Sequence, residues 1–243
     1  MDGRVRYPAC RSGHTGFSIL AAVVFAMHAI VFSSFVNAAD AYPWNDTPLA
    51  EASGLPSWSN ALERHTRQRS KISACLAHEK SCTGRYRAVA HILERARELT
   101  QEGRIKLAHR YINRLRYNID RPRRVWNEAT DKKTVYRNRW ATLDEFLTHG
   151  GDCEDYAVAK YFLLREMGMS ADRLRVVITF ERRGRNHHAL LAVRMPAEGS
   201  GKAEDVWLLE SDNSIDRIPH EGYRFVYALN EHHVWDHAEP LDT

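Results

Sequence analysis

The sequence predicts an α+β fold, with helices in the first part of the chain and an antiparallel sheet in the second. Apolar side chains recur at helical spacing between about residues 60 and 119. After residue 173 the pattern changes to short apolar and β-branched segments with short connections, as in antiparallel strands. The predicted strands are 174–181, 187–194, 205–211 and 224–229.

The composition is that of an ordinary globular protein. Of 243 residues, 44% are hydrophobic and 27% are charged, which excludes wholesale disorder, a collagen-like fibre and a multi-span membrane protein. Thirty-five Lys and Arg against 31 Asp and Glu give a formal charge of +4. This excess is too small to indicate a nucleic-acid partner.

The N-terminus has the pattern of a secretory signal peptide. Three arginines precede an apolar run over 17–36, and small residues end at Ala39. We expect cleavage of residues 1–39, although the run is long enough to serve as an uncleaved membrane anchor. In either case residues 40–243 form a single exported domain, and without the leader its formal charge is +2.

Export also bears on the cysteines. Cys10 belongs to the leader, so Cys75, Cys82 and Cys153 remain. Cys75 and Cys82 are seven residues apart, which allows a small disulfide loop in an oxidising compartment; two separate buried thiols are the alternative. Cys153 is left over in either case.

The helical region contains several elements. Apolar stripes at helical spacing over 86–99 and 108–115 predict two core-packing helices, and the polar, basic stretch 120–139 predicts a loop. Residues 142–145 form a capping-box pattern that starts a short helix ending at Gly150-Gly151. A second helix is expected from about Asp152 to Met167, and it is apolar almost all round, as in a buried helix.

A candidate catalytic group follows from this arrangement. Cys153 falls in the first turn of the buried helix, where the helix dipole stabilises a thiolate. A histidine and an acid that orients it complete a cysteine nucleophile. His187 or His188 at the start of the second strand and Asp212 after the third supply them in the order Cys, His, Asp. A buried inert cysteine with unrelated surface histidines is the structural alternative.

The run Gly150-Gly151-Asp152-Cys153-Glu154-Asp155-Tyr156-Ala157-Val158-Ala159-Lys160-Tyr161 resembles the nucleophile motif of the bacterial transglutaminase-like cysteine proteinases of the LapG type. Trp140-Ala141-Thr142, His188-Ala189-Leu190-Leu191 and Asp212-Asn213 are similar to that family as well, so the resemblance covers roughly 110–230. It implies a papain-like or transglutaminase-like fold and a periplasmic cysteine endopeptidase with Cys153, His188 and Asp212 as its triad.

The resemblance also implies partners. Family members of this type bind Ca²⁺ beside the active site and cut a large surface adhesin near its N-terminus, which controls biofilm attachment. An inner-membrane receptor that senses cyclic-di-GMP holds them inactive. This chain departs from the pattern at Leu143, where the family usually has Pro. It departs again at Glu210-Ser211-Asp212-Asn213, where the family usually has Leu-Asp-Asn.

Strand parity leaves the choice of histidine open. His187 shares a face with Ala189, and His188 shares the opposite face with Leu190. The resemblance favours His188.

Three carboxylates surround the nucleophile. Asp152, Glu154 and Asp155 repel one another unless a cation offsets them. A Ca²⁺ held by Asp152 and Glu154, with Asp155 as a further ligand, would do so. The alternative is a set of acids that favour a helix N-terminus without a metal.

Two other functions stay open. A thioacyl enzyme attacked by a lysine amine would be a transglutaminase-type acyl transferase. A catalytically silent module that binds calcium or a receptor is the second alternative.

Overall fold

The computed structural model describes residues 42–44, 46–78, 82, 84–119, 123–127, 132–136, 139–181, 186–196, 205–217 and 223–237. The predicted signal peptide, residues 1–39, lies outside the described residues. Among the described residues, no helix has both the length and the apolar character needed to cross a membrane.

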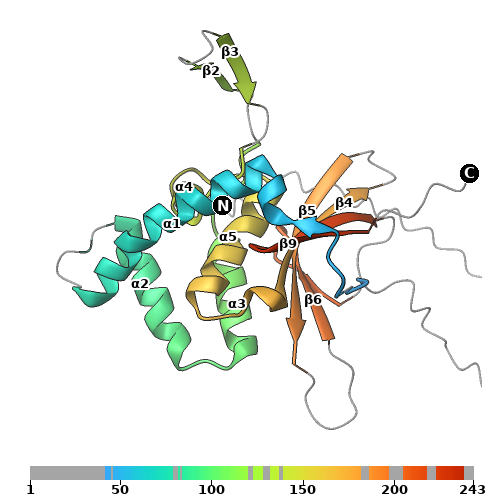
Figure 1. Cartoon of the computed structure of the whole chain (residues 1–243). Coiled ribbons are helices and arrows are strands. Elements are labelled where there is room, and N and C mark those ends of the chain that lie inside the picture. Colours follow the sequence, from blue (N-terminus) through green and yellow to red (C-terminus); the bar gives the residue numbers. More distant parts are fainter. Residues whose placement is uncertain are drawn as a thin grey trace, which may run out of the picture.

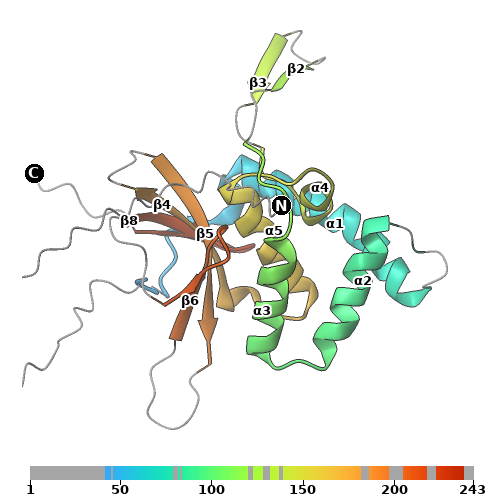
Figure 2. The same cartoon turned by 180° about the vertical axis from the view of Figure 1, so that it is seen from behind.

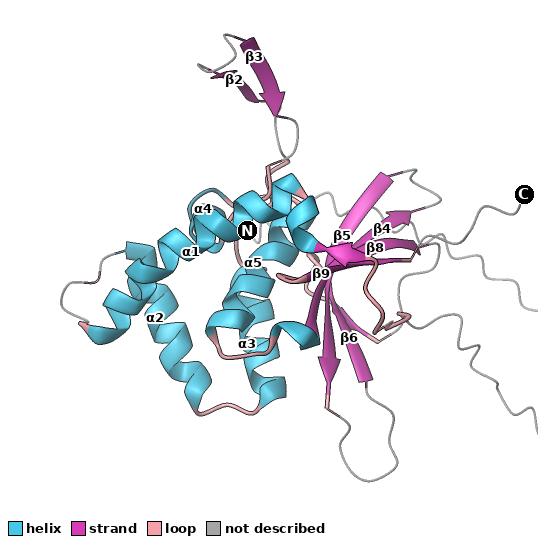
Figure 3. Ribbon diagram, viewed as in Figure 1, coloured by secondary structure: helices cyan, strands magenta, loops and turns pink. Residues whose placement is uncertain are grey.

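In the described part of the chain, five α-helices lie on one side of a sheet (Figures 1 and 3). Their bounds are α1 Pro56–Ala77, α2 Gly84–Arg97, α3 Gln101–Ile112, α4 Leu143–His149 and α5 Cys153–Glu166. The predicted capping box is present: the Thr142 hydroxyl accepts from Glu145 N, and the Glu145 carboxylate accepts from Thr142 N. The expected helices are therefore confirmed, and α4 begins where its cap predicts.

Among the residues that the structure describes, the sheet has seven antiparallel strands in the order β1-β9-β8-β4-β5-β6-β7. The bounds are β1 Ala50–Glu51, β4 Leu174–Glu181, β5 Asn186–Met195, β6 Asp205–Leu209, β7 Ile215–Asp216, β8 Tyr223–Leu229 and β9 His233–Asp236. The four predicted strands are confirmed. β1, β7 and β9 are two to four residues long, too short for a periodicity to reveal them.

The predicted loop over 120–139 is wrong in part. Arg123–Asn127 (β2) and Lys132–Tyr136 (β3) pair antiparallel as a separate hairpin, which projects from the body in both views (Figures 1 and 2). The basic residues of this stretch suggested a solvated loop, but its Val, Trp, Thr and Tyr residues favour a strand.

The predicted disulfide is present. Cys75 lies in the last turn of α1 and bonds to Cys82, and their Cα atoms are 5.0 Å apart. The bond holds the end of α1 close to the start of α2. Cys153 therefore keeps its thiol, as expected for the residue left over.

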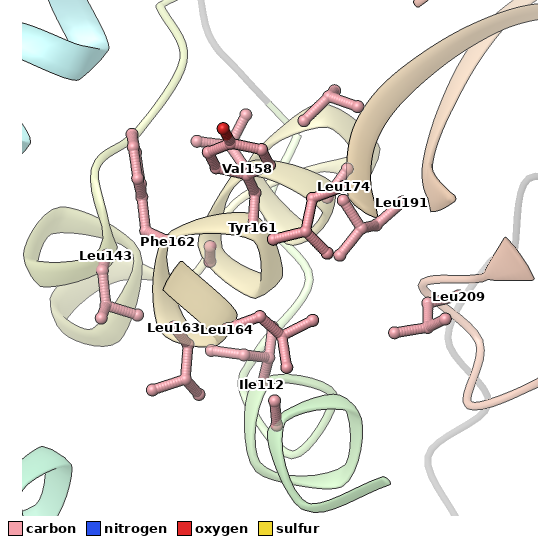
Figure 4. Close-up of a cluster of buried hydrophobic side chains, with 14 of the residues drawn as sticks. Ile112, Leu143, Val158, Tyr161, Phe162, Leu163, Leu164, Leu174, Leu191 and Leu209 are labelled. Atoms are coloured by element: carbon pink, nitrogen blue, oxygen red, sulfur yellow. The ribbon is translucent and has the colours of Figure 1, made fainter. Parts of the chain in front are cut away.

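Helix α5 is the centre of the core. Its apolar side chains contact β4 and β5 on one side and α3 and α4 on the others (Figure 4). The labelled residues are Ile112, Leu143, Val158, Tyr161, Phe162, Leu163, Leu164, Leu174, Leu191 and Leu209. A smaller apolar cluster on the opposite face of the sheet includes Leu190, Leu208 and Tyr42. Because α5 is packed on nearly all sides, its N-terminal turn is held rigidly.

Candidate active site

The ends of three secondary-structure elements lie at one end of the molecule because the strands are connected antiparallel. A short turn joins α5 to β4, so β4 runs back toward the start of α5. β5 pairs antiparallel with β4 and therefore begins at that same end. β6 pairs antiparallel with β5, with Leu209 opposite Leu191, so its last residues return there too. The fold thus brings together the start of α5, the start of β5 and the end of β6.

The turn before α5 requires its two glycines. Gly150 has φ 70°, and a Cβ there would lie 1.9 Å from the carbonyl oxygen of Arg116. A Cβ on Gly151 would lie 2.2 Å from Asp155 Oδ2. The backbone therefore approaches its neighbours too closely for any side chain. This close packing sets the direction in which Cys153 enters the helix.

Cys153 is the first residue of α5, and only 8% of its surface is exposed. Its thiol donates a hydrogen bond to Glu154 Oε2 at 3.3 Å. The N-terminal N–H groups of the helix favour an anion at this position, whereas the neighbouring carboxylate favours the neutral thiol. The balance between these two effects decides how readily the thiolate forms.

Asp155 anchors the nucleophile turn. Its side chain is buried, Oδ1 accepts from Ala141 N at 2.7 Å, and Oδ2 accepts from Asp152 N at 3.4 Å. One carboxylate therefore connects the turn to the Trp140-Ala141 segment. Since buried polar groups need such partners, the bonds account for an acid at a buried position of this helix.

His188 lies buried at the start of β5, with 4% of its surface exposed. Its Nε2 is 2.6 Å from Oε2 of Glu210, which is also 4% exposed. The Thr179 hydroxyl on β4 donates to the backbone oxygen of His188 at 3.4 Å, and the Tyr223 ring centroid lies 5.5 Å from the imidazole. The His188 ring is thus contacted from β8 and the end of β6, and its backbone is bonded from β4.

The two candidate histidines have different surroundings. His187 is exposed, and its ring packs edge-on to Phe180 with 5.3 Å between centroids. His188 is buried and hydrogen-bonded to a carboxylate. Of the two, His188 therefore has the environment that a catalytic base requires.

The carboxylate bonded to His188 is that of Glu210, two residues before the predicted Asp212. β6 ends at Leu209, and Asp212 follows in an exposed turn, where its Oδ1 accepts from Ser214 N at 3.0 Å. Sequence reasoning therefore missed Glu210. The available signal was its position directly after the apolar strand, where the related family usually has Leu-Asp-Asn.

The bond to Glu210 assigns roles to the two ring nitrogens. In a neutral imidazole one nitrogen carries the proton and the other a lone pair. Nε2 donates to the Glu210 carboxylate, so Nδ1 is the nitrogen with the lone pair. This tautomer lets His188 accept a thiol proton at Nδ1, while Glu210 stabilises the imidazolium that forms.

The three predicted metal ligands differ in their surroundings. Asp155 uses both oxygens for backbone N–H groups, whereas Asp152 and Glu154 are half-buried beside Cys153. Within the described ranges, no three His, Cys, Asp or Glu side chains form a metal-binding cluster. Of the three predicted ligands, Asp152 and Glu154 fit a hard cation best, and other ligands would have to complete the site.

Comparisons with known proteins identify the family and the fold. Residues 71–239 match the family model described as bacterial transglutaminase-like cysteine proteinase. The structure is similar to calcium-bound Legionella pneumophila LapG, with a TM-score of 0.51 and 20% identity over 72% of this chain and 92% of that one. It is also similar to EGTA-treated Legionella pneumophila LapG, with a TM-score of 0.51 and 20% identity over 68% of this chain and 84% of that one. No curated protein matches the chain. The predicted transglutaminase-like α+β fold is therefore confirmed.

Proposed function

Because the chain belongs to the bacterial transglutaminase-like cysteine proteinases, we propose that it is a periplasmic cysteine endopeptidase whose reacting residues are Cys153 and His188, positioned by Glu210. The observation that carries this proposal is the buried His188–Glu210 pair at the end of the molecule where Cys153 begins α5. The proposal replaces the predicted Asp212 by Glu210.

The residues support the following sequence of steps. His188 Nδ1 takes the proton of the Cys153 thiol, and the thiolate attacks a peptide carbonyl. Backbone N–H groups at the start of α5 are positioned to stabilise the oxyanion. His188 then protonates the leaving amine, and water releases the acyl group from Cys153 with His188 as the base. Throughout, Glu210 holds the imidazole tautomer and offsets its positive charge.

The proposed cofactor is Ca²⁺, held by Asp152 and Glu154. When bound, the ion would offset the negative charge of these two carboxylates beside the nucleophile. The support is the pair of half-buried acids on either side of Cys153, together with the calcium-bound state of the similar Legionella protein. Calorimetric titration of chelator-treated protein with CaCl₂ tests this proposal. Binding heat that disappears in Asp152→Asn and persists in the exposed control Asp172→Asn is expected, and no binding heat would remove calcium from the mechanism.

The proposed substrate is a large exported surface adhesin cut near its N-terminus, under the control of an inner-membrane cyclic-di-GMP receptor. The leader pattern of residues 1–39 and the Cys75–Cys82 disulfide support export to an oxidising compartment. The family resemblance supports the adhesin and the receptor. In this reading the protein releases cells from a biofilm.

The experiment compares cells that carry wild-type protein with cells that carry Cys153→Ala. Release of a large surface protein should stop in the variant, and mass spectrometry should find that protein with its N-terminal cleavage site intact. Unchanged release from folded Cys153→Ala would contradict the endopeptidase. A primary amine probe that becomes linked to protein only with wild-type enzyme would instead support acyl transfer.

A further inference from the structure

Lys160 is a charged residue in the buried core. It lies two turns after Cys153 on the helix packed on all sides, and none of its surface is exposed. Asp155 and Lys160 are the charged residues among the buried positions of α5. Asp155 already has a task, since it anchors the nucleophile turn. A buried ammonium is costly unless specific acceptors hold it, so the contacts of Lys160 need an explanation.

The Lys160 ammonium is hydrogen-bonded to the backbone at the end of β6. Lys160 Nζ donates to the carbonyl oxygen of Glu210 at 2.6 Å and to that of Leu209 at 3.4 Å. The Tyr156 ring lies 5.7 Å away on the same helix. Side chains on a helix lean toward its N-terminus, so Lys160 reaches toward the end where Cys153 lies. Glu210 thus accepts from Lys160 with its backbone carbonyl and bonds His188 with its carboxylate.

A second donor acts on the same atom. Asn113, which follows α3, donates from Nδ2 to the Glu210 carbonyl oxygen at 2.9 Å. Glu210 N in turn donates to Ser214 O at 3.1 Å. The backbone of Glu210 is therefore fixed from α5, from α3 and from its own turn. These bonds lie just past the last residue of β6, where the strand ladder no longer holds the chain.

We propose that Lys160 is a positioning residue that ties Glu210 to the nucleophile helix and so sets the distance between the Glu210 carboxylate and His188. Asn113 is the weaker second tie. The inference rests on the proposed function, because the positioned pair is the proposed base and its acid. It extends that function to a residue that contacts neither substrate nor reacting atoms.

The charges around Lys160 are consistent with this role. Burial lowers the pKa of Lys160 to about 7, while Glu210 and Asp212 act in the opposite direction. His109 on α3 also faces it, and burial together with Lys160 lowers the pKa of His109 to about 4. Both the ammonium and the neutral amine of Lys160 carry N–H donors, so the tie to the Glu210 carbonyl is retained across neutral pH.

The test follows the His188 Nε2–H resonance by NMR of protein labelled with ¹⁵N-histidine. In wild-type protein this proton should lie far downfield and exchange slowly with water. Loss of this resonance in His188→Ala assigns it to His188. A shift of the resonance in Glu210→Gln identifies Glu210 as the hydrogen-bond partner. Lys160→Met should speed its exchange at least about 10-fold and lower kcat by about 10- to 100-fold, with little change in KM. Lys106 is an exposed lysine on α3, and Lys106→Met is the matched control. It should change neither the exchange rate of the His188 proton nor kcat.

Asn113→Ala keeps the inference testable if Lys160→Met does not fold. Asn113 is half-buried, and its loss should change the resonance in the same direction by a smaller amount. An unchanged His188 resonance in folded Lys160→Met, or in Asn113→Ala if only that variant folds, would overturn the proposal. The resonance does not depend on substrate cleavage. A protein with the expected NMR behaviour but with a dispensable Cys153 would therefore contradict the proposed function and leave the positioning role standing.

Discussion

His188 Nε2 and Glu210 Oε2 lie 2.6 Å apart, and each residue exposes only 4% of its surface. A buried contact of this length between an imidazole N–H and a carboxylate is a charge-assisted hydrogen bond whether the imidazole is neutral or protonated, because the carboxylate is ionised. It fixes the ring tautomer, which is what a cysteine nucleophile requires of the group that orients its base.

Replacing the acid should therefore impair the chemistry rather than binding. Glu210→Gln keeps the shape but removes the charge and allows the wrong tautomer, so kcat should fall by roughly 10²- to 10⁴-fold with KM little changed. Steady-state kinetics on a segment of the proposed substrate that spans its cleavage site measure this. Asp212→Asn is the control, and its kcat should stay within about twofold of wild type. The reverse pattern, with Asp212 essential and Glu210 dispensable, would restore the sequence-based triad.

The turn before the nucleophile should not tolerate a methyl group at Gly151. A Cβ there would lie 2.2 Å from Asp155 Oδ2 and 2.4 Å from Asp155 Cβ, so Gly151→Ala must displace the residue that anchors the turn. We expect a loss of about 1–3 kcal/mol in stability and of about 100-fold in kcat. Urea denaturation and kinetics measure the two effects. Gly54→Ala has open space around the added carbon and should change neither, and wild-type behaviour of Gly151→Ala would show that the turn is looser than described.

Acid sensitivity should depend on Glu145, the residue of the α4 capping box. Burial alone would raise its pKa, but hydrogen bonds from Arg139 and Arg64 prevail and lower the pKa to about 2 from 4.5. A lowered pKa means that the stabilisation is complete above pH 4.5 and is lost as the pH falls toward 2.

The free energy of unfolding should thus differ between wild type and Glu145→Gln by a constant amount above pH 5. That difference should shrink between pH 4.5 and 2, as measured by urea denaturation at each pH. Glu63→Gln removes an exposed ion pair on α1 and should change stability by less than about 1 kcal/mol. A wild-type to Glu145→Gln difference that does not vary with pH would contradict the assignment.

The disulfide should stabilise the fold without affecting the catalytic residues. Cys75 and Cys82 close a short loop, for which the chain-entropy model gives about 2.5 kcal/mol. The Cys75→Ser/Cys82→Ser double variant should lose about that amount in chemical denaturation and keep the wild-type kcat. A reductant should destabilise the wild-type protein and leave the double variant unchanged; equal stability of both in the oxidised state would mean that the bond contributes nothing.

Local sequence determined much of this protein. The Thr142 capping box started α4 as expected, Gly150-Gly151 ended it, and the all-round apolar character of 153–166 made α5 the central helix. These features depend on neighbours within about four residues, so a single sequence contains the information. The nucleophile candidate Cys153 follows from the same local pattern, because its position in the first turn of α5 is set by that turn alone.

Only the tertiary structure decided which acid meets His188. The choice between Glu210 and Asp212 depends on where β6 leaves the sheet, because residues two apart would face the same side of a continuing strand. Lys160 on α5 and Asn113 just after α3 hold the Glu210 backbone, and the Asp155 carboxylate accepts from Ala141 N. These contacts join residues distant in the chain, so the local periodicity of the sequence does not predict them.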